Sequence, residues 1–201
     1  MMSAPERSPE RDAAIEAMLP MVGLTGWTMT TVLAAAGPDA DLLFPGGTAD
    51  MIEVYFDWAD RRMEAGAAAA DLSQLRLPGR VRAVLAIRFA QNRDHKDAVR
   101  RALGVLAAPG HATLALRCTA RTVDAIWHAA GDRSSDFSWY TKRATLAAVY
   151  GATLLYWLRD YSPEDEATLE FLDRRLAGVG RIGRLRRRGE AALQRFRPAS
   201  A

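Results

Sequence analysis

Residues 28–47 read TMTTVLAAAGPDADLLFPGG, and this stretch decides the fold. Thr28 can cap a short helix, because a threonine hydroxyl accepts a hydrogen bond from a backbone N–H of the first turn. Gly37 and Pro38 then end that helix. Residues 39–44 leave room for barely one more helical turn before a Pro-Gly-Gly turn. The stretch therefore predicts two very short helices with a tight break between them.

Two longer helices flank this stretch. Apolar residues recur at helical spacing over residues 9–22, and Thr48 can cap a long helix that follows. This order of elements resembles the N-terminal domain of TetR-family repressors. A DNA-recognition helix needs donors such as arginine or lysine for phosphates and base edges. Residues 12–58 contain no lysine or arginine, and the candidate segment contains Asp39 and Asp41. We therefore expect a degenerate helix-turn-helix that binds no nucleic acid.

The remainder of the chain also has helical patterns, with no run of alternating β-branched residues that would indicate a strand. Helices are expected over residues 77–91, 96–106, 112–130 and 137–159, and Ser162-Pro163 is a strong start for one more. The fold class is therefore all-α, a TetR-repressor-like helical bundle. We divide it into an N-terminal region over 1–66, a C-terminal helical domain over 67–180 and a basic amphipathic tail over 181–201.

The segment over residues 144–158 has no charged side chain. A helix that is apolar all round is normally buried, so we expect burial on nearly every side. The segment is shorter than the roughly 20 residues that a membrane-spanning helix needs. It is therefore expected to be a core helix.

Charge divides the chain unevenly. The net charge is only +3, yet nine arginines lie between Arg174 and Arg197 against the single acid Glu190, so that the preceding part is acidic. The one cysteine, Cys118, has no second cysteine or metal-ligand spacing and is expected to be an ordinary helix residue. The N-terminus lacks the apolar core of a signal peptide. These features favour a cytoplasmic bacterial protein.

The most specific stretch is residues 122–143, TVDAIWHAAGDRSSDFSWYTKR. Its pattern, D-x-x-W-H-x-A-G-D-x-S-x-D-F-x-W-Y-T-K-R, resembles the signature of an accessory protein family of ubiquinone (coenzyme Q) biosynthesis, often called the ninth coenzyme Q protein. The resemblance continues to about Leu176, and it includes the Phe-Pro-Gly-Gly turn at residues 44–47 and Gly-Arg-Val-Arg at 79–82.

This resemblance implies a TetR-like helical fold without DNA binding, usually as a homodimer. It implies an apolar pocket between the C-terminal helices for an isoprenoid quinone precursor or a phospholipid. Members of the family present their lipid at the membrane to the di-iron hydroxylase of the pathway and have no reaction or cofactor of their own. The expected location is therefore the cytoplasmic side of a bacterial inner membrane, as a peripheral protein.

The resemblance also implies a surface that docks the hydroxylase. Carried over residue by residue, this surface falls on Ile126, His128, Asp136, Trp139, Tyr140 and Arg143. Without the resemblance, the same corner is better interpreted as structural, because tryptophan and tyrosine contribute much buried area. Adjacent residues of a helix point in different directions. One of Trp139 and Tyr140 is thus expected to be exposed, and an exposed aromatic beside an arginine is typical of a binding hot spot.

A metal centre is the enzymatic alternative for this corner. His128, Asp132 and Asp136 have a tolerable spacing, but they form an incomplete ligand set, and no Glu-x-x-His pair is present. No metal is therefore predicted, and no catalytic residue.

For the lipid pocket, the candidates are apolar residues of the last core helices and of the helix expected to lie opposite. They are Leu114, Leu116, Val149, Leu154, Leu155, Leu158, Phe171 and Leu172. Ordinary core packing would require the same residue types at the same spacing. For this reason the pocket rests on the resemblance.

The tail is predicted to form an interfacial amphipathic helix on anionic membrane. The residues expected to meet the membrane are Ile182, Arg184, Leu185, Arg186, Arg187, Arg188, Leu193 and Phe196. A solvated basic tail, or one paired with the acidic body, is the alternative. Phe196 is its single aromatic residue, which argues against binding of single-stranded nucleic acid.

Together these features predict a non-catalytic accessory protein of ubiquinone biosynthesis that binds an isoprenoid lipid and presents it to a hydroxylase. The alternative from another class is a ligand-responsive TetR-type transcriptional regulator.

Overall fold

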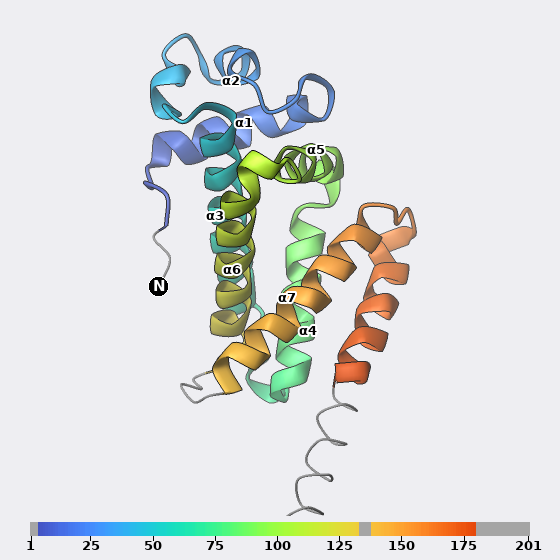
Figure 1. Ribbon diagram of the computed structural model, residues 1–201. Helices are drawn as coiled ribbons and strands as arrows, with labels where there is room; N and C mark the ends of the chain where they lie inside the picture. The colour runs from blue at the N-terminus through green and yellow to red at the C-terminus, as the bar shows by residue number, and fades with distance from the viewer. Residues whose placement is uncertain (1–3, 133–137, 180–201) are drawn as a thin grey trace, which may run out of the picture.

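A computed structural model describes residues 4–132 and 138–179 of the chain. Within these ranges every regular element is helical, which confirms the all-α prediction (Figure 1). The elements are α1 (Pro9–Thr25), α2 (Met29–Ala36), η1 (Ala40–Leu43), α3 (Gly47–Ala69), η2 (Leu72–Gln74), α4 (Leu77–Gln91), η3 (Arg93–His95), α5 (Lys96–Leu106), η4 (Pro109–His111), α6 (Ala112–Ala129), α7 (Ser138–Trp157), η5 (Pro163–Asp165) and a last helix over residues 166–179.

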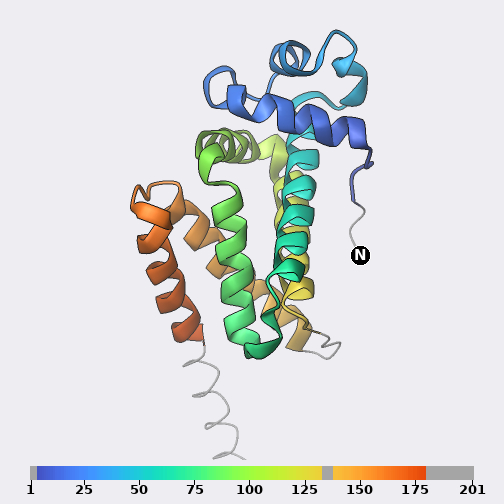
Figure 2. The same ribbon diagram turned by 180° about the vertical axis from the view of Figure 1, so that it is seen from behind.

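Helix α1 and the short elements α2 and η1 form a tip at one end of the molecule (Figures 1 and 2). The Thr28 hydroxyl caps α2 by accepting a hydrogen bond from the Thr31 backbone N–H at 3.2 Å, as expected. The element after it, at the recognition-helix position, is only the four-residue 3-10 turn η1. Its side chain Asp41 is exposed and acidic. The helix-turn-helix is therefore degenerate in length as well as in charge.

The long helix α3 connects the tip to the C-terminal helices, and it packs against α6 along its length (Figure 1). Residue 66, where the domain boundary was expected, lies inside this helix. Thr48 does not cap α3, contrary to expectation. Its hydroxyl donates instead to the carbonyl of Trp27 at 2.7 Å, while Gly46 occupies the cap position. Thr48 thus ties the tip to α3.

The tip is also anchored to the body by buried contacts. The Trp27 indole N–H donates to the carbonyl of Ala98 on α5 at 2.9 Å, and the Trp27 ring lies 5.0 Å from that of Tyr55. Arg61 makes a bidentate pair with Asp12, at 2.6 and 2.7 Å, which joins α3 to α1. The tip and body are therefore held by both apolar packing and ion pairs.

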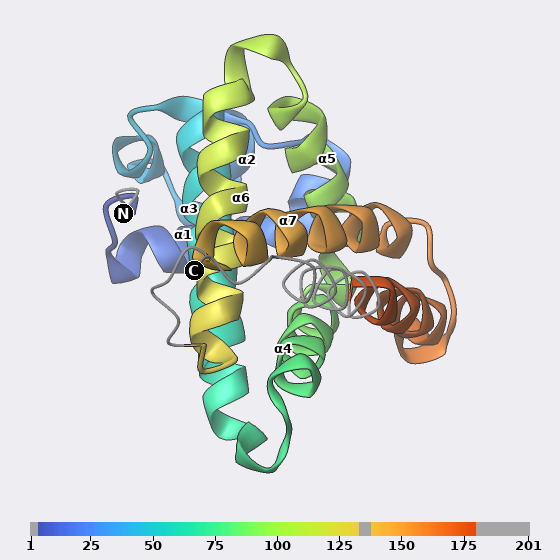
Figure 3. The ribbon, with the colours of Figure 1, turned by 60° about the horizontal axis from the view of Figure 1, so that its bottom comes forward.

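Helix α7 crosses α6 and α4 (Figure 3). Its inner face is buried: the Tyr150 ring stacks on Phe89 of α4 with centroids 6.3 Å apart, and the Trp157 ring is tilted against Phe89 at 5.5 Å. The expectation of burial on nearly every side is wrong, however, because Leu155 is 63% exposed and Tyr156 is exposed as well. Among the described residues, the last helix covers part of this outer side, where Phe171 stacks on Tyr156.

The start of the last helix also differs from expectation. Ser162-Pro163 opens the 3-10 turn η5 and not an α-helix, because Glu164 and Asp165 adopt left-handed backbone conformations with φ of 53° and 58°. The α-helix begins only at residue 166. The chain therefore turns sharply between α7 and the last helix, which brings the two helices into an antiparallel pair (Figure 1).

Candidate functional site

An open groove of about 630 Å³ lies between α5, α7 and the last helix. This volume falls within the range of small-molecule sites, roughly 300 to 1,000 Å³. The lining residues are Arg100, Leu103, Gly104, Ala152, Leu155, Tyr156, Leu158, Arg159, Phe171 and Arg175.

The floor of the groove is apolar because small residues and leucines occupy it. Gly104 on α5 and Ala152 on α7 have little or no side chain, so the groove is deep between these helices. A Cβ added at Gly104 would meet no other atom within 4 Å. Leu103 and Leu155 add apolar surface from α5 and α7. The groove can therefore accept an apolar chain without displacing the core.

An aromatic pair forms the wall between α7 and the last helix. The rings of Tyr156 and Phe171 are stacked, with centroids 4.5 Å apart and an angle of 11° between their planes. The Arg175 guanidinium lies 4.7 Å from the Phe171 ring centroid on the same helix. The wall thus presents apolar ring surface with a positive charge beside it.

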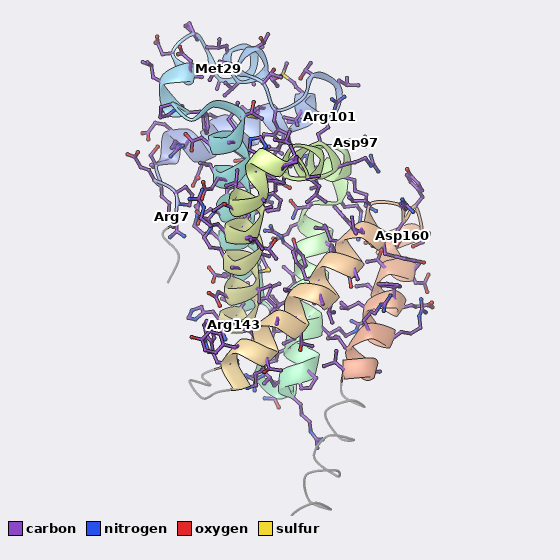
Figure 4. The ribbon with its side chains drawn as sticks, viewed as in Figure 1. Arg7, Met29, Asp97, Arg101, Arg143 and Asp160 are labelled. Carbon is purple, nitrogen blue, oxygen red and sulfur yellow. The ribbon has the colours of Figure 1, made fainter. Side chains whose placement is uncertain are left out.

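The turn at residues 160–165 holds the last helix in place. The Asp160 carboxylate accepts hydrogen bonds from the Ser162 N–H at 2.8 Å and from the Thr168 N–H and hydroxyl at 2.8 and 2.6 Å. Burial opposes ionisation of this carboxyl, but the hydrogen bonds from Thr168 and Ser162 outweigh it and lower the pKa of Asp160 to about 2. Figure 4 shows Asp160 at this turn.

A second cluster clamps the same turn onto α5. The buried Asp165 carboxylate pairs with Lys96 at 2.7 Å and with Arg93 at 2.9 Å. Lys96 also donates to the Asp160 carbonyl at 2.7 Å and lies 4.8 Å from the Trp157 ring centroid. These contacts compensate for the left-handed conformation of Asp165, and they fix one end of the groove.

The groove contains three of the eight residues predicted for a lipid pocket, namely Leu155, Leu158 and Phe171. The others do not line it. Leu114, Val149, Leu154 and Leu172 are buried in the core, and Leu116 is 68% exposed on α6. The prediction for Leu116 is wrong. Helix α6 packs its other faces against α3 and α7, so the Leu116 side chain lies in solvent.

Sequence reasoning missed the α5 side of the groove and its arginines. Leu103, Gly104 and Arg100 come from a helix that precedes α7 by about 30 residues in the sequence, and their proximity depends on the turn at 160–165. The strong amphipathic pattern of α5 was the one available signal. It indicates a buried face but not which helix lies opposite.

The second candidate site is the corner where α6 ends and α7 begins, in which Arg143 is labelled in Figure 4. The Arg143 guanidinium lies 3.7 Å from the Trp139 ring centroid, and the rings of Trp139 and Tyr140 meet edge-on with centroids 4.7 Å apart. Arg143 also pairs with Asp124 of α6. Tyr140 is 72% exposed while Trp139 is half-buried, as the geometry of adjacent helix residues predicted.

Among the residues predicted for this corner, His128, Trp139, Tyr140 and Arg143 are at least partly exposed. The prediction that Ile126 lies on this surface is wrong, because its side chain is 0% exposed and belongs to the core. It lies on the face of α6 that is turned inward. Asp136 lies outside the described residues.

The metal alternative at His128, Asp132 and Asp136 includes a residue, Asp136, that lies outside the described residues. Within residues 4–132 and 138–179, no group of three His, Cys, Asp or Glu side chains could hold a metal ion. Cys118 is buried, and burial raises the pKa of its thiol to about 11. In the same ranges no helix is long and apolar enough to cross a membrane. The predicted membrane-binding tail, from Ile182 to Phe196, lies outside the described residues.

The core also contains an ion pair under α7. Arg88 and Asp60 approach to 3.1 Å, and Thr122 donates to the Asp60 carboxylate at 3.0 Å. Burial raises the pKa of Asp60 to about 6, against the opposing effects of Arg88 and Thr122. The cavity beside Arg88 has a volume of only about 10 Å³. It has room for about one water molecule, so it is not a lipid site.

Comparisons with known proteins concern the region that contains both candidate sites. Residues 112–183 match the family model COQ9. The ubiquinone biosynthesis protein COQ9, mitochondrial, of Rattus norvegicus is 41% identical over 98 residues, which are 47% of this chain and 31% of the relative. The ubiquinone biosynthesis protein coq9, mitochondrial, of Schizosaccharomyces pombe is 32% identical over 145 residues, or 72% of this chain and 57% of the relative. The chain thus matches about a third to just over half of these relatives' length.

A solved structure supports the fold independently. The TetR transcriptional regulator from Nitrosomonas europaea ATCC 19718 superposes with a TM-score of 0.70 at 24% sequence identity, covering 86% of this chain and 99% of that one. The TetR-like fold is therefore confirmed. At this identity the likeness concerns the arrangement of helices alone.

Proposed function

This chain belongs to the COQ9 family, and from that premise we propose that it is a non-catalytic accessory protein of ubiquinone biosynthesis. In this proposal it binds an isoprenoid quinone precursor in the groove between α5, α7 and the last helix. It then presents this lipid to a di-iron hydroxylase that docks on the corner at Trp139 and Tyr140. The basic tail holds the protein on the anionic inner membrane of a bacterium.

The observation that supports lipid binding is the groove itself. Its volume of about 630 Å³, its small floor residues and its exposed leucine and aromatic side chains suit an apolar chain. Exposed apolar area of this kind is costly in water unless a ligand or partner covers it. Two of its walls, α7 and the last helix, fall inside the segment that matches the family.

The docking part is supported by the composition of the corner. Tyr140 is exposed, Trp139 is held between Tyr140 and Arg143, and Asp124 fixes Arg143. Rigid aromatic and arginine side chains bind partners at a low entropic cost. If the proposal holds, Tyr140→Ala weakens capture of the hydroxylase in a pull-down, whereas Tyr161→Ala, at another exposed tyrosine, leaves it unchanged. Equal capture by both variants would contradict the docking role.

The lipid role is tested by native and extract mass spectrometry of the full chain from a quinone-producing bacterium. We expect an isoprenoid quinone intermediate at near-stoichiometric occupancy. The Gly104→Leu variant fills the groove and should lose it. Gly151→Leu is the matched control, because it adds the same side chain to a helix position where an added Cβ also meets nothing within 4 Å, and Gly151 does not line the groove. Equal occupancy in both variants would place the lipid elsewhere.

The tail is tested by co-sedimentation with anionic vesicles. Truncation after Val179 should remove most of the binding and leave the helical circular dichroism nearly unchanged. If full-length and truncated protein sediment equally, the tail is not the membrane-binding element.

A further inference from the structure

Two arginines near the start of α4, Arg80 and Arg82, bind different neighbours. Arg82 makes a bidentate pair with Asp173 of the last helix, at 2.6 and 3.0 Å. Arg80 contacts the end of α6 instead, where its Nη1 donates to the Ala130 carbonyl at 3.1 Å. The start of α4 lies at the same end of the molecule as the corner between α6 and α7 (Figure 1). Arg80 thus connects α4 with the element from which the docking corner begins.

Helix α6 ends in a tight turn around Gly131. The φ of Gly131 is 75°, in the left-handed region that favours glycine. The Gly131 N–H donates to the His128 carbonyl at 2.9 Å. The Asp132 N–H donates to the Trp127 carbonyl at 3.0 Å, which completes the hydrogen-bond pattern of a Schellman motif. The end of α6 therefore has a fixed geometry that continues as far as Asp132.

The Arg80 guanidinium is held on this turn by contacts with two segments. Its Nε donates to the carbonyl of Leu75, between η2 and α4, at 2.9 Å, while its Nη1 binds the Ala130 carbonyl. The side chain packs so closely that a Cβ added at Gly131 would lie 2.9 Å from Nη1. A planar guanidinium holds two acceptors in fixed directions, which the ammonium group of lysine does not. Arg80 therefore fixes where α6 ends relative to α4.

From this turn the contacts continue to α7. The Asp132 carboxylate pairs with Lys142 at 3.4 Å, and the Lys142 ammonium lies 5.9 Å from the Trp127 ring centroid. Lys142 follows the exposed Tyr140 by two residues, near the start of α7. The place where α6 ends thus helps to set where α7 starts and how Tyr140 is presented to solvent.

We propose that Arg80 is a positioning residue for the docking corner: it holds the end of α6 so that α7 presents Tyr140 to the hydroxylase. This inference rests on the proposed docking function. Aromatic anchors bind best when they are already held in their bound orientation. Loss of the Arg80 side chain leaves the Ala130 carbonyl, at the negative end of the helix, without its charged donor. The turn then relaxes, and Tyr140 adopts orientations that fit the partner less well.

The test measures the Kd of the full chain for the hydroxylase of the same bacterium by biolayer interferometry. Arg80→Gln should raise this Kd by roughly five- to tenfold, within the range of effects of residues that act through a neighbour. Arg80→Lys keeps the charge but not the planar fork, so its Kd should lie between those of wild type and Arg80→Gln. Arg82→Gln is the matched control, because it removes an arginine and an ion pair from the same helix but acts on the last helix. Its Kd should stay within about twofold of wild type.

A double-mutant cycle separates positioning from a general loss of stability. If Arg80 acts through Tyr140, Arg80→Gln has little further effect on the Kd once Tyr140→Ala is present, so the two changes are not additive. A general structural defect would weaken the remaining contacts equally in both backgrounds. Hydrogen exchange followed by mass spectrometry should show faster exchange over residues 127–132 and 138–143 in Arg80→Gln and unchanged exchange in α1. If Arg80→Gln does not fold, Arg80→Lys takes its place in the same cycle.

The Tyr140→Ala variant distinguishes this inference from the proposed function. If Tyr140→Ala weakens binding of the hydroxylase while both Arg80 variants bind like wild type, the positioning role is overturned and the docking function stands. Additive effects in the cycle, or an effect of Arg82→Gln as large as that of Arg80→Gln, would also overturn it. If Tyr140→Ala binds like wild type, the docking function fails and the inference fails with it.

Discussion

Replacement of Asp160 should lower the stability of the fold beside the groove, because its carboxylate caps the last helix. Its carboxylate receives three hydrogen bonds of 2.6 to 2.8 Å from Ser162 and Thr168. In Asp160→Asn the side chain keeps its size but turns an N–H₂ group toward one of these donors. A buried donor then loses its acceptor, which typically costs about 1–3 kcal/mol.

The lowered pKa of Asp160 gives the magnitude independently. A change from 3.8 in the unfolded chain to about 2 in the folded protein corresponds to about 2.5 kcal/mol of stability at neutral pH. The folded pKa is depressed, so this contribution is present above the unfolded pKa and is lost as pH falls through the folded one. At pH 3 about half of it should remain.

Urea unfolding followed by circular dichroism measures this contribution as the difference between wild type and Asp160→Asn. We expect a loss of about 2–3 kcal/mol at pH 7 that shrinks to roughly half at pH 3. Glu166→Gln removes an exposed acid from the same region and should change stability by less than about 0.5 kcal/mol. A difference that is the same at pH 7 and pH 3 would refute the charged cap, and one below that of the control would refute the cap altogether.

Three further predictions concern the core and the groove. Asp60→Ala leaves the buried Arg88 without its partner and should lower the free energy of unfolding by about 3–5 kcal/mol in urea titrations, whereas a loss under 1 kcal/mol would show that the pair is solvated. Gly104→Ala should raise the thermal midpoint through a gain of about 0.5–1 kcal/mol, because the new Cβ meets open space. The Cys118 thiol should not react with Ellman's reagent at pH 8 until the protein is unfolded, so rapid labelling of the native protein would contradict its burial.

The helices could be predicted well wherever local signals mark their ends. The bounds expected for 77–91 and 96–106 are those of α4 and α5, since each has a sharp break on at least one side. The start of the last helix could not be predicted in this way. Ser162 and Pro163 satisfy every local rule for a helix start, yet pairing of Asp165 with Lys96 and Arg93 holds two residues in a left-handed conformation. Tertiary ion pairs there override the local preference.

In the candidate sites, too, local features could be predicted from the sequence and features that depend on tertiary packing could not. Helix geometry predicted that one of Trp139 and Tyr140 is exposed, and the packing of α7 decides that it is Tyr140. The burial of Ile126 was not predicted, because the resemblance placed it on the docking surface and only the packing of α6 decides which face of the helix is turned inward. The groove required knowledge of which helix faces α7. An uncharged segment such as 144–158 fits a fully buried helix and a helix with one open face equally well.

The open outer face of α7 connects the fold with the proposed function. In a TetR-like arrangement the tip would meet DNA, but here the recognition element is a single 3-10 turn with exposed Asp41 and no lysine or arginine over residues 12–58. The groove lies beside the tip, because its α5 wall packs against α1, and it exposes the apolar side chain of Leu155. Under the function proposed here, the groove takes the place of the tip as the binding site of this helical frame.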